Sequence, residues 1–161
     1  MQVRIETLNE KKLVGKSERM SIVANKTSDL WRSFMSERKA IQNTVGSDLY
    51  SMQVYDSLSY FEKFNPNAEF TKFAAIEVKN FNIIPNGFKK ITINSGLYAV
   101  FLHKGPASEF PKTMQYIFGE WLPDSNYELE ARPHFEKLGD RYKNNAPDSE
   151  EEVWIPIRIK T

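Results

Sequence analysis

Short stretches in which apolar and polar residues alternate recur along the whole chain. Alternation with a period of two is typical of strands that pack one face against a core. It predicts strands over residues 2–7, 12–17, 49–56 and 72–79 in the first half of the chain, and over 89–93, 97–102 and 153–159 in the second, with an extended segment around Phe135. Turn signals such as Pro85-Asn86-Gly87 separate these stretches.

Two stretches instead repeat apolar residues at helical spacing. The first begins at a capping Thr27 or Ser28 and carries Leu30, Phe34 and Ile41 on one face. The second begins near Ser108 and carries a longer apolar stripe, formed by Phe110, Met114, Ile117, Phe118 and Trp121. Each half of the chain is therefore predicted to contain one main helix.

The order strand, helix, strand, strand thus occurs twice, about 80 residues apart, a longer period than solenoid repeats have. It predicts an α+β fold in a single domain over 1–161, with one module at about 1–80 and a second at about 88–161. Antiparallel sheets and two main helices would flank a central cleft on a pseudo-twofold axis. Laying the modules on each other aligns Asp56 with Glu136.

Composition narrows the classes of function. The 161 residues carry a net charge of +1, so no excess of Lys and Arg indicates binding to nucleic acid or to an anionic membrane. No cysteine is present, which excludes disulfides and thiol catalysis. His103 and His134 lack clustered carboxylates, so we expect solvated histidines and no metal site. No glycine-rich phosphate loop is present, so no cofactor is expected. No apolar run has transmembrane length, and we expect a cytoplasmic protein.

Aromatic residues make up 13% of the chain, and they surround the most informative acid, Glu136. A carboxylate held among aromatic side chains needs a cationic or hydrogen-bonding partner, or a proton. Glu136 is therefore a candidate anchor for a guest; the alternative is a surface Glu paired with Lys137 or Arg132. Trp154 alternates with aliphatic neighbours, so it faces the cleft if they face the core, or else covers an edge.

Three more aromatic residues are candidates for the cleft. Trp121, at the end of the second helix, is the best placed of its stripe to reach a pocket. Tyr116 projects away from that stripe, toward the cleft or toward water. Phe34 is the counterpart of this set in the first module, with a core position as the alternative. The acidic run 148–152 is expected to be a solvated loop before the last strand.

Four segments, in order and with sensible spacing, resemble a known family. They are Leu97-Tyr98-Ala99-Val100-Phe101-Leu102-His103-Lys104-Gly105-Pro106, Glu120-Trp121-Leu122-Pro123-Asp124-Ser125-Asn126-Tyr127-Glu128-Leu129, Pro133-His134-Phe135-Glu136 and Val153-Trp154-Ile155-Pro156-Ile157. Together they look like the gyrase-inhibitor-like effector-binding domain, which is also found at the C-terminus of AraC-type and MerR-type transcription activators. The resemblance implies a tandem of two strand–helix–strand–strand modules. It also implies binding of small, often amphipathic or cationic molecules in an aromatic cleft whose central Glu matches Glu136.

The expected function is a standalone small-molecule-binding protein whose ligand contacts Glu136, Trp154, Trp121, Tyr116 and Phe34. The effector-like region fills the chain and leaves no room for a helix-turn-helix module, so direct binding to nucleic acid is not expected. One alternative is a hydrolase in which Glu136, as general base, activates water against an electrophile held by Trp154 and Trp121. Another is an inhibitor that contacts a protein partner such as gyrase or a regulator.

Overall fold

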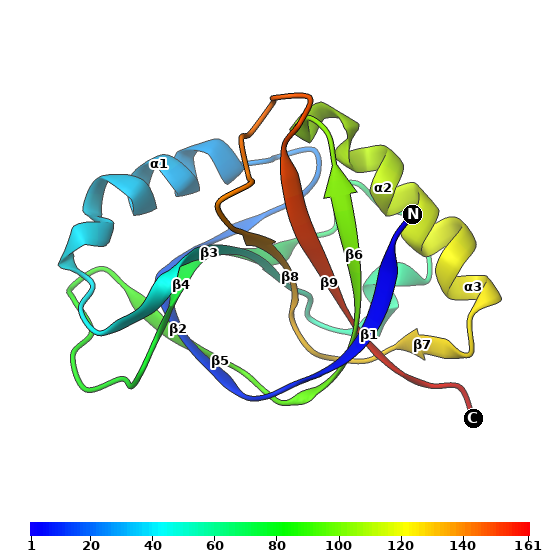
Figure 1. Cartoon of the computed structure of the whole chain (residues 1–161), viewed down its shortest axis with the longest axis horizontal. Helices are drawn as coiled ribbons and strands as arrows, with labels where there is room; N and C mark the ends of the chain where they lie inside the picture. The colour runs from blue at the N-terminus through cyan, green and yellow to red at the C-terminus, as the bar shows by residue number, and fades with distance from the viewer.

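Two successive runs of strand, helix, strand, strand build the fold, as Figure 1 shows. The computed structural model describes residues 1–161. The first run consists of β2 (Lys11–Met20), α1 (Thr27–Glu37), β3 (Thr44–Val54) and β4 (Phe70–Val78); the second consists of β6 (Gly96–Lys104), α2 (Phe110–Tyr116), β8 (His134–Leu138) and β9 (Glu150–Ile159). The remaining strands are β1 (Val3–Leu8), β5 (Lys89–Ile93) and β7 (Tyr127–Leu129). The predicted α+β class with two main helices is confirmed.

All the strands belong to one antiparallel sheet with the order β1-β6-β9-β8-β3-β4-β2-β5, and β7 pairs with β9. This order is symmetric about the central pair β3 and β8, where Ser51 lies opposite Glu136. The outer strands are exchanged between the two runs: β1 leads into β2 but pairs with β6, while β5 leads into β6 but pairs with β2. Each run therefore completes the sheet of the other.

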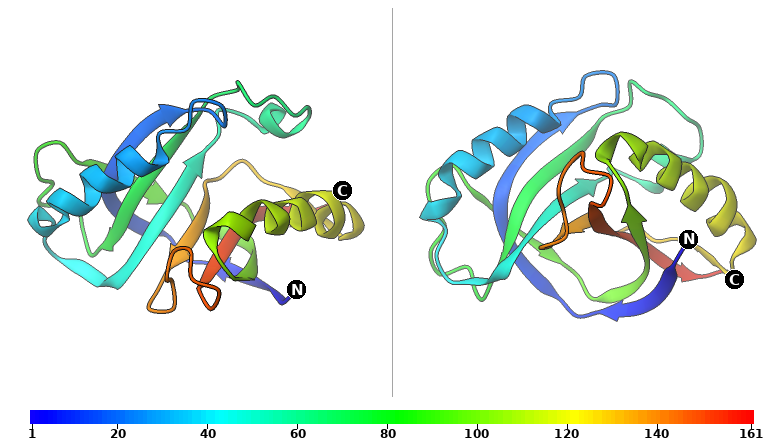
Figure 2. Two further views of the ribbon diagram at one scale, coloured as in Figure 1. Left: turned by 90° about the horizontal axis from the view of Figure 1, so that it is seen from above. Right: turned by 45° about the horizontal axis from the view of Figure 1, so that its top comes forward.

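Both helices cover the same face of the curved sheet, one over each half (Figure 2). The apolar side of α1, with Leu30 and Phe34, packs against β2 and β4. Helix α2 continues through a π-helical stretch, Ile117–Trp121, into the short α3 (Leu122–Asp124). Its buried Ile117 packs against residues of β6 and β9. Because the helices lie over the two outer parts of the sheet, the central strands β3 and β8 run between them.

The other face of the sheet carries a third core, which is rich in aromatic rings. Its largest members are Tyr50, Phe73, Tyr98, Phe135 and Trp154. Strand alternation produces this division, since neighbouring residues on one strand point to opposite faces of a sheet. The core on this face therefore draws on strands from both runs.

Three local predictions are wrong. The acidic run is not a solvated loop, because Glu150 begins β9 and Glu151 is buried. His103 and His134 are both buried rather than solvated, since His103 packs against Phe110 and His134 packs against aromatic rings. Helix α1 ends at Glu37, and Ile41 follows a 3-10 turn instead of extending the helix. No helix has the length and apolar content needed to cross a bilayer.

Candidate functional site

Glu136 lies at the centre of the sheet, on the face that carries the helices. In β8 its neighbour Phe135 points into the aromatic core on the other face, so alternation turns Glu136 toward α1 and α2. Ser51 of β3 lies opposite it on one side and Val153 of β9 on the other. Glu136 is only 6% exposed. A carboxylate this deeply buried requires partners within the protein.

Those partners come from the first run of the fold. Gln53 Nε2 donates a hydrogen bond to Glu136 Oε1 over 3.1 Å, and Lys72 Nζ lies 3.7 Å from the same oxygen. Gln53 and Lys72 are themselves opposite each other in the pairing of β3 with β4. The expected surface partners are engaged elsewhere, since Lys137 pairs with Asp48 and the Arg132 guanidinium donates to backbone carbonyls.

Burial sets the protonation of this cluster. Desolvation raises the pKa of Glu136, although the charge of Lys72 and the hydrogen bond from Gln53 act in the opposite direction. Desolvation likewise lowers the pKa of Lys72. Burial, reinforced by the charge of Glu136, raises the pKa of Glu151 to about 7. These three residues form what we call the floor of the site, on the sheet between the two helices. The floor therefore contains two acids, Glu136 and Glu151, and one base, Lys72, and the pKa of each is shifted by burial.

Aromatic side chains, which we call the aromatic group, flank this floor on one side. Phe61, on a 3-10 turn at Leu58–Phe61, stacks on His134 at 5.2 Å and on Phe118 at 5.5 Å between ring centroids. Tyr55, Tyr60 and Phe70 complete the group. Burial lowers the pKa of His134 to about 3, so its ring is neutral at physiological pH and stacks as an uncharged aromatic.

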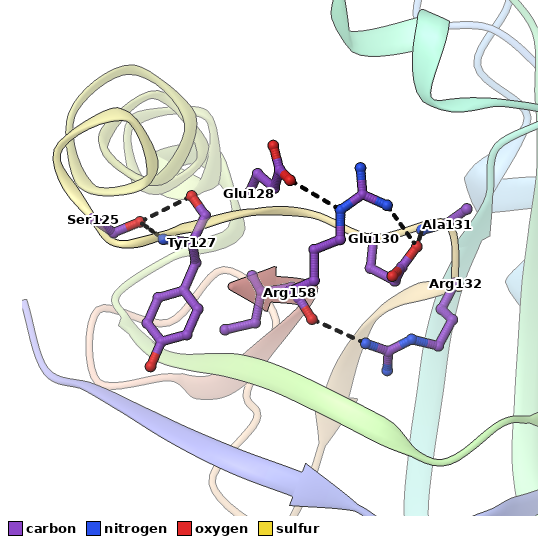
Figure 3. Close-up of polar contacts among 8 residues, drawn as sticks. Ser125, Tyr127, Glu128, Glu130, Ala131, Arg132 and Arg158 are labelled. Atoms are coloured by element: carbon purple, nitrogen blue, oxygen red, sulfur yellow. Dashed lines mark hydrogen bonds and ion pairs between the residues drawn. The ribbon is translucent and has the colours of Figure 1, made fainter. Parts of the chain in front are cut away.

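A cavity of about 190 Å³ opens beside the aromatic group, and Tyr55, Phe61 and His134 form part of its wall. Arg132 contributes to the same wall, just before β8 begins. Its Nη2 donates to the carbonyls of Leu97 and Ile157, and Figure 3 shows Arg132 with one such bond. These bonds fix the segment that leads into His134.

The other predicted site residues lie apart from Glu136. Trp154 is on the opposite face of the sheet, where it stacks on Phe135 at 5.3 Å. The prediction that it faces the site is wrong, because the aliphatic residues beside it pack under α2 on the same face as Glu136. Trp121 packs edge-on against Phe101 at 5.0 Å, beneath the π-helical stretch.

The two remaining aromatic candidates also belong to packed clusters. Tyr116 is half-buried against the cluster under α2, and Phe34 is fully buried under α1 beside Phe88. Asp56, aligned by sequence with Glu136, lies beyond the end of β3, exposed and paired with Arg19. The first run therefore contributes no second acid at this position.

The sequence analysis missed Lys72, Gln53 and Phe61. One signal was available for Lys72: strand alternation puts it on the same face as Ala74 and Ile76, and a Lys on an apolar face requires a buried partner. Phe61 gave no comparable signal, because it lies on a turn outside any periodic segment.

Comparison with known proteins gives a matching protein family, a related regulator and two solved structures of the same fold. A family model of the GyrI-like small molecule binding domain matches residues 1–158. The transcriptional regulator BrlR of Pseudomonas aeruginosa is 32% identical over 93 residues, which are 57% of this chain and 34% of BrlR. The matched part is thus about a third of that regulator's length.

Two solved structures share the fold. That of SAV2435 bound to tetraphenylphosphonium has a TM-score of 0.76 at 17% identity and covers 98% of this chain and 94% of its own. That of a hydrolase from Listeria innocua, encoded by lin2189, has a TM-score of 0.60 at 11% identity, with coverage of 98% and 92%. At such identities the likeness concerns the fold alone.

Proposed function

Because the chain belongs to the GyrI-like small molecule binding domain family, we propose that it binds a small aryl-rich amphipathic molecule between its two helices, with the buried polar cluster centred on Glu136 anchoring the polar group of the guest. The observation that carries this proposal is the burial of an acid at the centre of the sheet, with only one of its oxygens hydrogen-bonded. A buried acid costs stability unless it is well paired, and it is a common feature of functional sites.

The aromatic group supports an aryl-rich guest. Phe61 packs against both Phe118 and His134, whose rings also stack on each other at 6.3 Å between centroids, so the three rings form one compact cluster of nearly parallel aromatic faces. The adjoining cavity of about 190 Å³ is smaller than the roughly 300 Å³ at which ligand pockets usually begin. A guest would therefore enter by displacing Phe61, which joins the space that its ring fills to the cavity. That SAV2435 binds tetraphenylphosphonium, a molecule made of four aryl rings, agrees with this class of guest.

Thermal-shift screening tests the proposal. The panel contains tetraphenylphosphonium, triphenylphosphine oxide and zwitterionic aryl compounds, and the proteins are the native chain, Glu136→Gln and Glu62→Gln. Glu62 is exposed next to the turn that carries Phe61, so its substitution is the matched control. We expect at least one compound to stabilise the native chain and Glu62→Gln, with a smaller shift in Glu136→Gln. If no compound stabilises the native chain, or if all shifts survive in Glu136→Gln, the proposal is wrong.

Hydrolysis is a second candidate function, favoured by the raised pKa of Glu136. A carboxylate whose pKa is raised by burial is a better general base near neutral pH than an exposed one. Glu136 would take a proton from water as that water attacks an electrophilic ring carbon of the guest; the ring bond to that carbon breaks, and the released ring atom takes up the proton from Glu136. Turnover of an epoxide or cyclopropane probe that is lost in Glu136→Gln and retained in Glu62→Gln would support hydrolysis. If the probe binds without turnover, hydrolysis is refuted and only the proposal of binding stands.

A further inference from the structure

We propose that Lys72 is a built-in counter-ion of Glu136, so that the site selects uncharged, hydrogen-bond-accepting aryl molecules over permanent cations. This inference rests on the proposed function and specifies its class of ligand. It concerns one residue pair, which joins β4 to β8 over the intervening strand β3.

The geometry of the pair leaves donors free. Lys72 Nζ lies 3.7 Å from Glu136 Oε1, a distance too long for a direct hydrogen bond. Lys72 is 8% exposed, and its ammonium makes no hydrogen bond in the structure. A lysine ammonium has three N–H donors. A nearly buried cation with free donors can be satisfied by a guest that brings an acceptor oxygen.

The charges around the pair disfavour a second cation. Glu136 and Glu151 both interact electrostatically with Lys72, and the ionisable groups around them, Tyr55, Tyr142 and the neutral His134, bring no positive charge. A permanent cation beside Glu136 would have to displace Lys72 or lie close to its ammonium. Like charges repel strongly where water is excluded, and Lys72 is tethered to a central strand. The carboxylate is therefore already neutralised by the chain itself.

A neutral acceptor meets no such penalty. A phosphoryl, sulfonyl or carbonyl oxygen can accept from Lys72 Nζ while the ion pair with Glu136 stays intact. Aryl groups attached to that acceptor would take the place of the Phe61 ring against Phe118 and His134. Triphenylphosphine oxide has this chemistry, and tetraphenylphosphonium matches it in aryl content but replaces the acceptor with a fixed positive charge.

The experiment compares these two probes by isothermal titration calorimetry at about pH 8, above the raised pKa of about 7 of Glu151. The proteins are the native chain, Lys72→Met, Lys72→Gln and the exposed control Lys79→Met. We expect the native chain and Lys79→Met to bind the oxide more tightly than the phosphonium. In Lys72→Met, phosphonium affinity should rise about tenfold and oxide affinity should fall by about the same factor, because the counter-ion and the donor are lost together. Lys72→Gln, which keeps donors without charge, should gain phosphonium affinity and retain most of its oxide affinity.

The outcomes separate this inference from the proposed function. If the native chain prefers the phosphonium, or if phosphonium affinity is the same in folded Lys72→Met and Lys72→Gln as in the native chain, the role of Lys72 is refuted while binding at Glu136 stands. If neither probe binds any of these proteins, both proposals are wrong. Circular dichroism of each variant establishes folding, and Lys72→Gln, which keeps hydrogen-bonding groups at the position, carries the test if Lys72→Met does not fold.

Discussion

Lys72 and Glu136 form a buried ion pair that reaches over β3 and ties the two halves of the sheet together. Neither residue has another ionic partner within 4 Å. Each charge therefore depends on the other for compensation, and the stability of the fold is linked to the chemistry of its candidate site. The consequences can be measured without knowledge of the natural ligand.

Removal of one charge should destabilise the protein more than removal of both. Glu136→Gln leaves the Lys72 ammonium buried without a counter-ion, so we expect a loss of about 3 kcal/mol in the free energy of unfolding. The double variant Glu136→Gln, Lys72→Met should lose less than the sum of the two single changes. Urea denaturation of all four proteins completes the cycle. Additive losses would mean that the pair contributes no coupling energy.

His134 should make stability fall with acidification. Its pKa is about 3 in the folded protein against an ordinary value of 6.5, so the unfolded chain binds the extra proton between these values. Stability conferred by the neutral ring is full above pH 6.5 and is lost as pH falls toward 3. The contribution is about 1.4 kcal/mol per pH unit at most. His134→Phe, which keeps an aromatic ring, should flatten the dependence in urea titrations. An unchanged slope would contradict the assigned cause.

Glu151 should make stability fall as pH rises, which is opposite to the effect of His134. Its pKa is raised from 4.5 to about 7, so the folded protein holds the proton more tightly than the unfolded chain between these values. The stability associated with protonated Glu151 is full below pH 4.5 and is lost as pH rises through 7. Glu151→Gln should therefore gain stability relative to the native chain as pH rises through this window. Because the effects of His134 and Glu151 partly cancel in the native protein, only the single variants resolve them.

Phe61 should compete with an aryl guest for the same space. We expect Phe61→Ala to bind the better of the two aryl probes several-fold more tightly, because the space that the Phe61 ring fills against Phe118 and His134 becomes free. Phe64→Ala is the matched control, since Phe64 is 78% exposed on the same loop. Calorimetry measures both. Weaker binding in Phe61→Ala would instead mean that Phe61 contacts the guest directly.

Gly15 should not tolerate a side chain. It lies on β2 opposite Ala75, and a Cβ built there would come within 2.7 Å of Ala75 Cα and closer to the backbone oxygen of Ala74. Since real Cβ atoms do not approach backbone this closely, Gly15→Ala must force β2 and β4 apart. We expect a loss of several kcal/mol or failure to fold, measured by urea denaturation. Gly119→Ala, where a Cβ meets nothing within 4 Å, is the control.

Periodicity predicted the strands and helices well because these segments are amphipathic. The alternating 89–93 and the helical stripe that contains Ile117 have single buried faces, and single faces produce clear periods. The prediction for the acidic run 148–152 failed because charge, not periodicity, was its basis. The charges indicated a solvated loop, whereas Glu151 pairs with His103 and so belongs to the sheet. Local composition does not reveal which strand will lie alongside.

The site was harder to predict than the fold. Glu136 was identified by its aromatic neighbours, but the assignment of Trp154 to the same face failed, because alternation alone does not say which face of a two-sided sheet carries the site. Lys72 and Gln53 approach Glu136 only through the pairings of β3 with β4 and with β8. These contacts join residues more than 60 positions apart in the sequence, as the separation of 83 between Gln53 and Glu136 illustrates.

Because β1 and β5 are exchanged, each run is hydrogen-bonded to a strand that leads into the other run. A rigid separation of the halves would break the pairing of β1 with β6 and of β5 with β2, as well as the central pair. The sheet therefore has no hinge along its symmetry axis, and a guest cannot be admitted by spreading the halves. Admission must depend on the surface segments above the floor: the turn that carries Phe61, and the 139–149 connection that rises beside α2 (Figure 2). Changes in those segments can then alter which molecules enter without altering the scaffold that holds the charges.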